Sequence, residues 1–310
     1  MIQSILHSAG DQAAAIGNVW NLMLAICGTM YVLVLAWLGH ALATRMRATS
    51  TGQAHDRTLT IALVAFVVLV VGLLTWLVAA SYLTDRRLHA GTSALSVRIT
   101  AKQWWWQVEY LDQVPSKRFT TANELHLPRD RTVRVELRSA DVIHSFWVPA
   151  LAGKEDLIPG QANALLLTPR VAGRFRGQCA EFCGLQHAHM ALDVQVESEA
   201  AFSAWVQRQR APAHAPATPT AQRGAQVFLG TACATCHAIT GTPANSRVGP
   251  DLTHFASRRT IGAGTLPMQR GALLAWIADP HRHKPGTLMP AVALSPQDLA
   301  SVSDYLMELR

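Results

Sequence analysis

The chain has 310 residues and a formal net charge of +7; half of its residues are hydrophobic and only 15% are charged, against about 25% in an average soluble protein. No segment holds a dense basic cluster, which argues against a nucleic-acid partner. The charge deficit is local, because residues 16–44 and 58–84 contain no Asp, Glu, Lys or Arg. Each range exceeds the roughly 20 residues that a helix needs to cross a bilayer. The sequence therefore excludes a wholly soluble protein.

Two membrane helices are expected at about 19–43 and 59–83, forming a hairpin within an N-terminal region of residues 1–94. The tail before the first helix lacks the basic segment of a cleaved secretory signal. Three arginines occupy the short connection between the helices: Arg45, Arg47 and Arg57. The positive-inside rule places this connection in the cytoplasm. Both chain ends are therefore expected on the outer, periplasmic side of a bacterial inner membrane.

Residues 95–206 change to a period of two, in which apolar side chains alternate with polar ones. The clearest examples are Val133, Val135 and Leu137, and later Leu192, Val194 and Val196. Prolines and glycines interrupt the region at short intervals, as they do between short strands. This pattern predicts an antiparallel β-sandwich or barrel, closed by a short helix at 198–209.

The remaining sequence divides into a linker and a small helical domain. Residues 207–220 contain the Pro- and Ala-rich run APAHAPATPT, which is typical of a semi-extended tether. Helices are expected at 221–229, 271–278 and 296–309 of a domain that spans 221–310. A domain of this size has little core of its own. A large bound cofactor would supply one.

The strongest chemical signal is the run Cys233-Ala-Thr-Cys236-His237. This is the spacing of c-type haem attachment, in which both thiols bond to the porphyrin and the histidine binds the iron. A thioredoxin-like dithiol or half of a zinc site would need a βαβ pattern or a second Cys/His pair nearby, and neither is present in the sequence. The domain is therefore expected to hold haem c.

The haem iron needs a second axial ligand, and two loop methionines compete for that role. Met289 stands in the run GTLMP about fifty residues after the attachment site, and Met268 lies in an earlier loop. Resemblance to c-type cytochromes, in which a Met-Pro pair supplies the ligand, favours Met289. The same resemblance implies that the carbonyl of Gly249-Pro250 orients the imidazole of His237.

A second group of ligand-type residues lies in the β-rich region: His144, Cys179, Cys183, His187 and Met190. Thiolate, imidazole and thioether form a soft ligand set that selects copper. A mononuclear blue-copper site needs one cysteine, so the second thiolate indicates two bridged copper ions, with Met190 as a weak ligand. Two alternatives remain: a Cys179–Cys183 disulfide and a thioredoxin-fold copper chaperone. His126 and His189 fall outside the pattern and are interpreted as structural.

With these motifs the chain resembles subunit II of haem–copper cytochrome c oxidases, in the caa-type form that carries a fused cytochrome c domain. Three local motifs add to the resemblance: 141–149 (DVIHSFWVP), 153–160 (GKEDLIPG) and 177–184 (GQCAEFCG). It implies a membrane protein with a two-helix hairpin, an all-β cupredoxin domain and an all-α cytochrome c domain. It further implies that the Glu181 carbonyl completes the dinuclear copper site and that its carboxylate binds Mg²⁺ beside subunit I. Trp104, in the run QWWW, matches the family's site of electron transfer from the donor.

The resemblance implies a function in respiration. The chain would accept electrons from cytochrome c or a bc complex onto its haem and pass them through copper to subunit I, which reduces O₂ to water. Subunits I and III and the lipid bilayer are the implied partners. Two alternatives differ in class: a membrane-anchored shuttle or copper-delivery protein without an oxidase, and the corresponding subunit of a nitrogen-oxide reductase.

One departure from the family concerns proton uptake. Family members open the second membrane helix with a glutamate ahead of a Trp-Thr pair, whereas this chain has HDRTLT at 55–60. Either Asp56 substitutes for that glutamate or protons enter differently. No proton-channel residue is therefore assigned.

Overall fold

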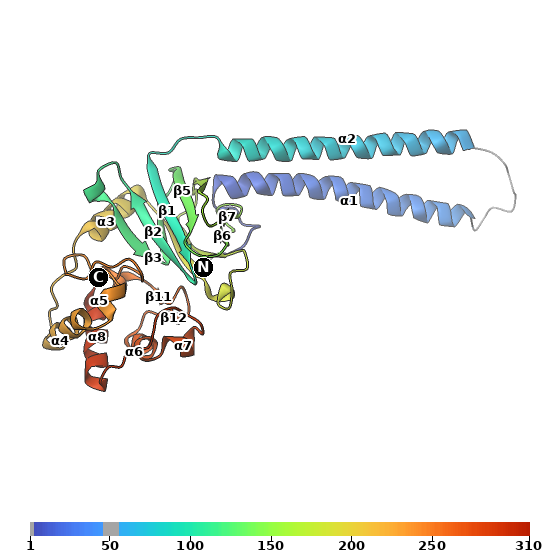
Figure 1. Ribbon diagram of the computed structural model, residues 1–310. Helices are drawn as coiled ribbons and strands as arrows, with labels where there is room; N and C mark the ends of the chain where they lie inside the picture. The colour runs from blue at the N-terminus through green and yellow to red at the C-terminus, as the bar shows by residue number, and fades with distance from the viewer. Residues whose placement is uncertain (1–2, 46–55) are drawn as a thin grey trace. The chain divides into compact units, whose positions relative to one another are not determined.

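The computed structural model describes residues 3–45 and 56–310. The chain forms two compact units, one made of Ala14–Gly91 and the other of Met1–Ala13 together with Thr92–Arg310 (Figure 1). Each unit has its own architecture, and the second holds every residue that the sequence analysis assigned to a metal, a haem or electron transfer.

The smaller unit consists of two long apolar helices. They are α1 (Asp11–Arg45), whose first turn belongs to the larger unit, and α2 (Asp56–His89). Both are long and apolar enough to cross a membrane, and both extend past the predicted 19–43 and 59–83. Arg47 lies outside the described residues, as does the side chain of Asp56.

The larger unit begins with a β-sandwich of two five-stranded sheets. The first sheet has the order β3 (Phe119–Ala122), β2 (Trp105–Leu111), β1 (Leu95–Lys102), β5 (Val133–Ser139), β8 (Asn163–Leu167). The second has the order β4 (Glu124–Pro128), β10 (Ala191–Glu197), β9 (Gly173–Cys179), β6 (His144–Trp147), β7 (Glu155–Leu157).

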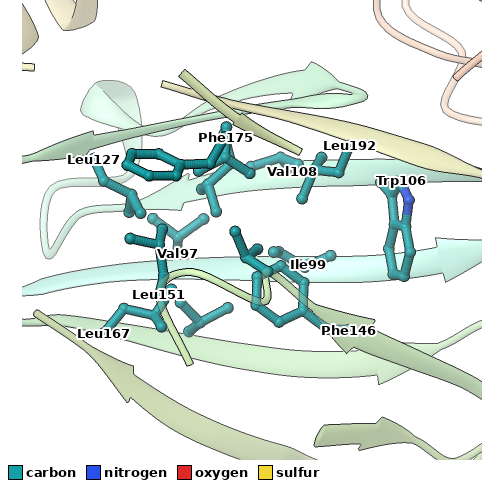
Figure 2. Packing of buried hydrophobic residues seen from close by; sticks show 14 of the residues in the cluster. Val97, Ile99, Trp106, Val108, Leu127, Phe146, Leu151, Leu167, Phe175 and Leu192 are labelled. Carbon is teal, nitrogen blue, oxygen red and sulfur yellow. The ribbon is translucent and has the colours of Figure 1, made fainter. Parts of the chain in front are cut away.

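The expected sandwich is confirmed, but not all of its strand pairs are antiparallel. The β1·β5 and β4·β10 pairs are parallel, because the chain crosses repeatedly between the sheets and sequence neighbours often lie in different layers. The inward residues of both sheets meet in one core, in which Trp106, Phe146 and Phe175 are fully buried (Figure 2). This core fixes the strand ends that carry the candidate copper ligands.

The N-terminal residues add to the β-sandwich, which the sequence did not indicate. Ala9 N donates to Ala150 O at 2.7 Å. Arg170 binds both carboxylate oxygens of Asp11 at 2.7 Å. These contacts tie the segment before α1 to the end of β8 and to the loop after β6.

The C-terminal domain, defined here as residues 219–310, is helical. Its helices are α4 (Pro219–Gly230), α5 (Cys233–Cys236), α6 (Arg270–Ala278), α7 (Pro280–His283) and α8 (Pro296–Glu308), with a small hairpin of β11 (Thr260–Ile261) and β12 (Leu266–Pro267). Helix α4 packs closely on α8 because Gly224 has no side chain. A Cβ there would lie 1.9 Å from Ser301 O.

The connection between the β-sandwich and the C-terminal domain is partly helical. Helix α3 (Glu199–Arg210), capped by Ser198, continues four residues into the predicted linker. The rest of the linker is bound along the C-terminal domain: Ala213 N donates to Thr240 O at 2.9 Å, and Ala217 N donates to the Glu308 carboxylate at 2.7 Å. The linker is therefore less free than its composition predicts.

Candidate functional site

The β-sandwich brings the predicted copper ligands together at one end. His144 opens β6, Cys179 closes β9, and Cys183 lies in the loop that follows. Sγ of Cys179 lies 3.7 Å from Sγ of Cys183 and 3.8 Å from Nδ1 of His144. His187 Nδ1 lies 3.6 Å from Cys183 Sγ. The ligand atoms of His144, Cys179 and Cys183 all fall within 4.8 Å of one another, a spacing that suits shared metal ions.

The electrostatics of the two thiols also suit metal binding. The hydrogen bond from Cys183 is the main cause that lowers the pKa of Cys179 to about 3, against an opposing effect of burial, and His144 adds to the lowering. The pKa of Cys183, beside that thiolate, is raised. The pair thus shares one proton at neutral pH, and metal binding must release it because thiolates are the ligands.

His144 is held by a residue to which the sequence analysis assigned no role. Its Nε2–H donates to Asp141 Oδ1 at 2.8 Å, which turns Nδ1 toward the thiols. The Asp141 carboxylate also accepts from Gln103 N at 2.6 Å. Such a carboxylate fixes the tautomer and orientation of a ligating histidine. A carboxylate three residues before a candidate histidine ligand is the sequence signal from which this supporting role of Asp141 could have been predicted.

The other residues that the sequence analysis discussed in this region lie either beside the cluster or away from it. Met190 is 1% exposed beside the cluster, and the Glu181 carbonyl lies 3.2 Å from Cys179 Sγ. The Glu181 carboxylate points elsewhere and lies 3.4 Å from Lys154 Nζ. His189 binds the side chain of Gln186 at 2.9 Å, and His126 lies between two glutamates.

In the C-terminal domain the Cys-x-x-Cys pair occupies the short helix α5, and His237 follows it. The Nδ1–H of His237 donates to Pro250 O at 2.7 Å, the contact predicted for an iron-ligating imidazole. Burial lowers the pKa of His237, which keeps the ring neutral. A Cβ on Gly249 would lie 2.8 Å from the ring, so only glycine fits against it. These residues fit the haem that their motif implies.

Both candidate methionine ligands pack against the core of the C-terminal domain. Met289 and Met268 are each partly buried there. Met289 ends the loop that starts at Gly286, whose φ of 82° favours glycine. The assignment of Met289 remains a prediction.

Trp104 is buried where the β-sandwich meets the loop of Gly286. Its side chain is 7% exposed, although the sequence pointed to an electron-transfer surface. The indole N–H donates to Cys183 O at 2.9 Å. A Cβ on Gly286 would meet the far edge of the same indole at 3.4 Å. Trp104 thus contacts both a candidate copper ligand and the loop that ends in Met289.

These features define a two-domain arrangement, a cupredoxin-like β-sandwich followed by a cytochrome c domain. Residues 114–197 match the family model described as cytochrome c oxidase subunit II, periplasmic domain, and residues 221–310 match the cytochrome c model. Cytochrome c oxidase subunit 2 of Alkalihalophilus pseudofirmus is 37% identical over 72% of this chain and 63% of its own length. That of Bacillus sp. (strain PS3) is 34% identical over 74% of this chain and 65% of its own. Over most of its length the chain is therefore similar to cytochrome c oxidase subunit 2.

A solved structure of the periplasmic domain of subunit II of cytochrome oxidase from Bradyrhizobium japonicum is also similar. It is 31% identical, covers 39% of this chain and 96% of its own, and has a TM-score of 0.36. The chain spans less than two thirds of the length of the two relatives above.

Proposed function

We propose that this chain is the subunit through which electrons enter a membrane-bound terminal oxidase. Electrons from cytochrome c or a bc complex would reach haem c in the C-terminal domain, then a dinuclear copper centre in the β-sandwich, and then subunit I, where O₂ is reduced to water. The oxygen-reducing site would therefore lie on another polypeptide.

One observation carries the proposal: two buried thiols 3.7 Å apart, with an imidazole beside each, lie at the end of a β-sandwich fused to a haem-attachment domain. Two bridging thiolates suit a pair of copper ions, and delocalised pairs exchange single electrons with little rearrangement. We assign as copper ligands His144, Cys179, the Glu181 carbonyl, Cys183, His187 and Met190. The haem residues are Cys233, Cys236, His237 and Met289.

We propose that electrons pass from the haem to the copper centre through the contact that Trp104 makes. Its buried indole bonds the carbonyl of Cys183 and packs against Gly286. An internal position of this kind suits transfer from the chain's own haem better than docking of an external donor.

The setting of the chain is proposed from its similarity to oxidase subunits and from its apolar helices. Helices α1 and α2 would anchor it in a bacterial inner membrane, with both ends and the redox domains on the periplasmic side. The domain limits are proposed as 1–94, 95–206, 207–220 and 221–310. Subunits I and III would be neighbours. The exposed Glu181 carboxylate would bind Mg²⁺ at subunit I in exchange for its contact with Lys154.

The test uses the purified oxidase complex and the variant Met289→Ala. Copper analysis should give about two copper ions per covalent haem in the wild type, and subunit I should co-purify. The variant should lower the haem potential, because thioether ligation favours reduced iron. Oxidation of external cytochrome c should slow, while the copper spectrum stays unchanged.

Met268→Ala is the matched control and should leave the haem potential unchanged. In rapid mixing, reduction of copper by cytochrome c at the wild-type rate while the haem stays oxidised would show that donors bypass the haem. A ratio of one copper per haem would contradict the dinuclear centre.

A further inference from the structure

A lysine of the C-terminal domain is buried where that domain meets the β-sandwich. Lys284 follows α7 and is 2% exposed. Its Nζ donates hydrogen bonds of 2.8 Å to each of three carbonyls, those of Trp104, His189 and Gly262. Among the described residues no carboxylate contributes to the electrostatics of this ammonium group.

Burying a lysine without a carboxylate is unfavourable, so its position calls for a compensating interaction. Desolvation lowers the pKa of Lys284 to about 7, and the nearby Cys183 opposes that change. The three carbonyls accept from all three N–H groups of the protonated form, which favours the charge. Charge-assisted hydrogen bonds of this kind are about twice as strong as neutral ones.

The three carbonyls belong to different parts of the molecule. Trp104 and His189 lie on the β-sandwich, whereas Gly262 follows β11 in the C-terminal domain. Both sandwich residues adjoin the copper-type cluster, which is the set His144, Cys179, Cys183, His187 and Met190. The Trp104 indole donates a hydrogen bond to Cys183 O, and His189 precedes Met190. One side chain therefore joins the two domains next to that cluster.

The residues after Lys284 continue this contact toward the proposed haem ligand. Pro285 O accepts from Gln186 Nε2 at 2.9 Å. At Gly286 a Cβ would lie 3.1 Å from Leu185 and 3.4 Å from Trp104, so the loop runs directly over the indole. Met289 stands three residues further along this loop.

We propose that Lys284 is a positioning residue that fixes the C-terminal domain on the β-sandwich, so that the loop of Gly286 and Met289 stays packed on Trp104. The inference rests on the proposed function, because a fixed contact matters only if electrons cross it. Electron transfer depends steeply on the separation and orientation of the two sites, so a loop that moves away from Trp104 should slow it.

Other contacts keep the two domains associated when Lys284 is replaced. Ala191 N donates to Ala263 O at 3.0 Å. Arg258, 8% exposed, lies 3.8 Å from Glu124 and 3.4 Å from the hydroxyl of Thr121 on the β-sandwich. A Lys284 variant should therefore loosen the contact at Trp104 without detaching the domain.

The test is Lys284→Met in the full oxidase complex, because methionine is similar in length and carries no donor. The haem is reduced by a light pulse through a ruthenium photosensitiser, and electron arrival at copper is followed by absorbance. We expect transfer to slow at least about tenfold and to become dependent on solvent viscosity. Hydrogen exchange at the Ala191 amide, which bonds across the same contact, should accelerate.

Two variants serve as controls. Lys102→Met removes another bond between the domains, the 3.0 Å contact of Lys102 Nζ with Arg247 O, which lies at an exposed position; it should leave the rate within about twofold of wild type. Lys284→Arg keeps a cation with several donors and should restore part of the rate.

Three results would overturn the inference: an unchanged transfer rate in Lys284→Met, an equal slowing in Lys102→Met, or loss of the copper signal or methionine-ligated haem band in Lys284→Met. The last would assign Lys284 to the metal sites instead. Absence of haem-to-copper transfer in the wild type would contradict the proposed function, which separates the two failures.

Discussion

The two candidate redox sites are built in opposite ways. The copper-type cluster draws its residues from β6, from the end of β9 and from the loop after it, so the β-sandwich must fold before they meet. The haem motif instead occupies five consecutive residues at the short helix α5. The difference implies that the copper site is shaped by the fold of the β-sandwich, whereas the haem motif is set by local sequence. The C-terminal domain has a hydrophobic core of its own, which the haem would extend.

The strongest test of this difference removes each cofactor in turn. The double variant Cys233→Ala/Cys236→Ala cannot bond haem covalently, and we expect the C-terminal domain to lose its protection from proteolysis, because a domain of about 90 residues with short helices buries little surface. Limited proteolysis with mass spectrometry would show cleavage within residues 221–310, while the β-sandwich stays intact.

Cys27→Ala is the matched control, because Cys27 lies in α1 and is exposed. It should leave both domains protected. Equal protection of the C-terminal domain with and without haem would show that its own side chains suffice as a core.

The next largest effect is expected from replacing a bridging ligand rather than a weak ligand of the copper-type cluster. Cys183→Ser removes a proposed bridging thiolate and should abolish the mixed-valence copper signal in electron paramagnetic resonance. Met190→Leu removes only a weak ligand of similar size and should retain two copper ions with an altered potential. If both variants lost copper equally, the separation of bridging and weak ligands would be wrong.

Asp141→Asn tests whether a residue that is not a ligand, but holds the ligand His144 in place, affects copper binding. The amide keeps the size of the side chain but weakens the 2.8 Å contact with His144 Nε2–H. Loss of such a partner typically costs 10- to 100-fold in metal affinity. Competition with a copper chelator measures this, and Asp156→Asn, an acidic residue on β7, is the control.

The two sites also differ in how much of them the sequence could predict. The haem motif is local, so its spacing alone identifies it, and the Pro250 carbonyl stands where the resemblance to c-type cytochromes placed it. The copper-type cluster is not local: ligand chemistry alone grouped His144 with cysteines 35 positions later, and only the folded β-sandwich brings them together. Strand alternation predicted the sandwich, with strands such as β5 and β10 where the pattern put them.

What the sequence could not predict depends on contacts between distant segments. The parallel pairs β1·β5 and β4·β10 arise from chain crossings that period-two alternation does not encode. Lys284 is a single lysine in a loop and gives no motif, because its three acceptors are backbone carbonyls. The burial of Trp104 depends on the C-terminal domain, which the linker composition suggested would be loosely attached.

The smallest predicted effect concerns a buried ionic cluster of the β-sandwich, which contains none of the proposed copper or haem ligands. The His126 ring stacks on Trp205 at 4.0 Å, with Nδ1 3.3 Å from Glu197 and Nε2 3.7 Å from Glu124. Burial alone would lower the pKa of His126, but the two glutamates outweigh it and raise the pKa to about 9. The charged ring therefore stabilises the folded state.

Because this pKa lies above its unfolded value, the stabilisation is complete below pH 6.5 and is lost as the pH rises through about 9. We expect a loss of about 1–2 kcal/mol in the free energy of unfolding, less than the full linkage value because the cluster relaxes. Two other titratable groups face the cluster: Arg258 lies beside Glu124, and the Tyr110 hydroxyl bonds the His126 backbone. The contribution of His126 is therefore measured as the difference in unfolding free energy between the wild type and a His126 variant. Urea unfolding of the full chain in detergent, followed by tryptophan fluorescence, is compared with His126→Gln between pH 6 and 9.5. The stability gap between the two proteins should shrink across that range, because glutamine carries no charge to lose; parallel profiles would show that His126 is neutral in the folded protein.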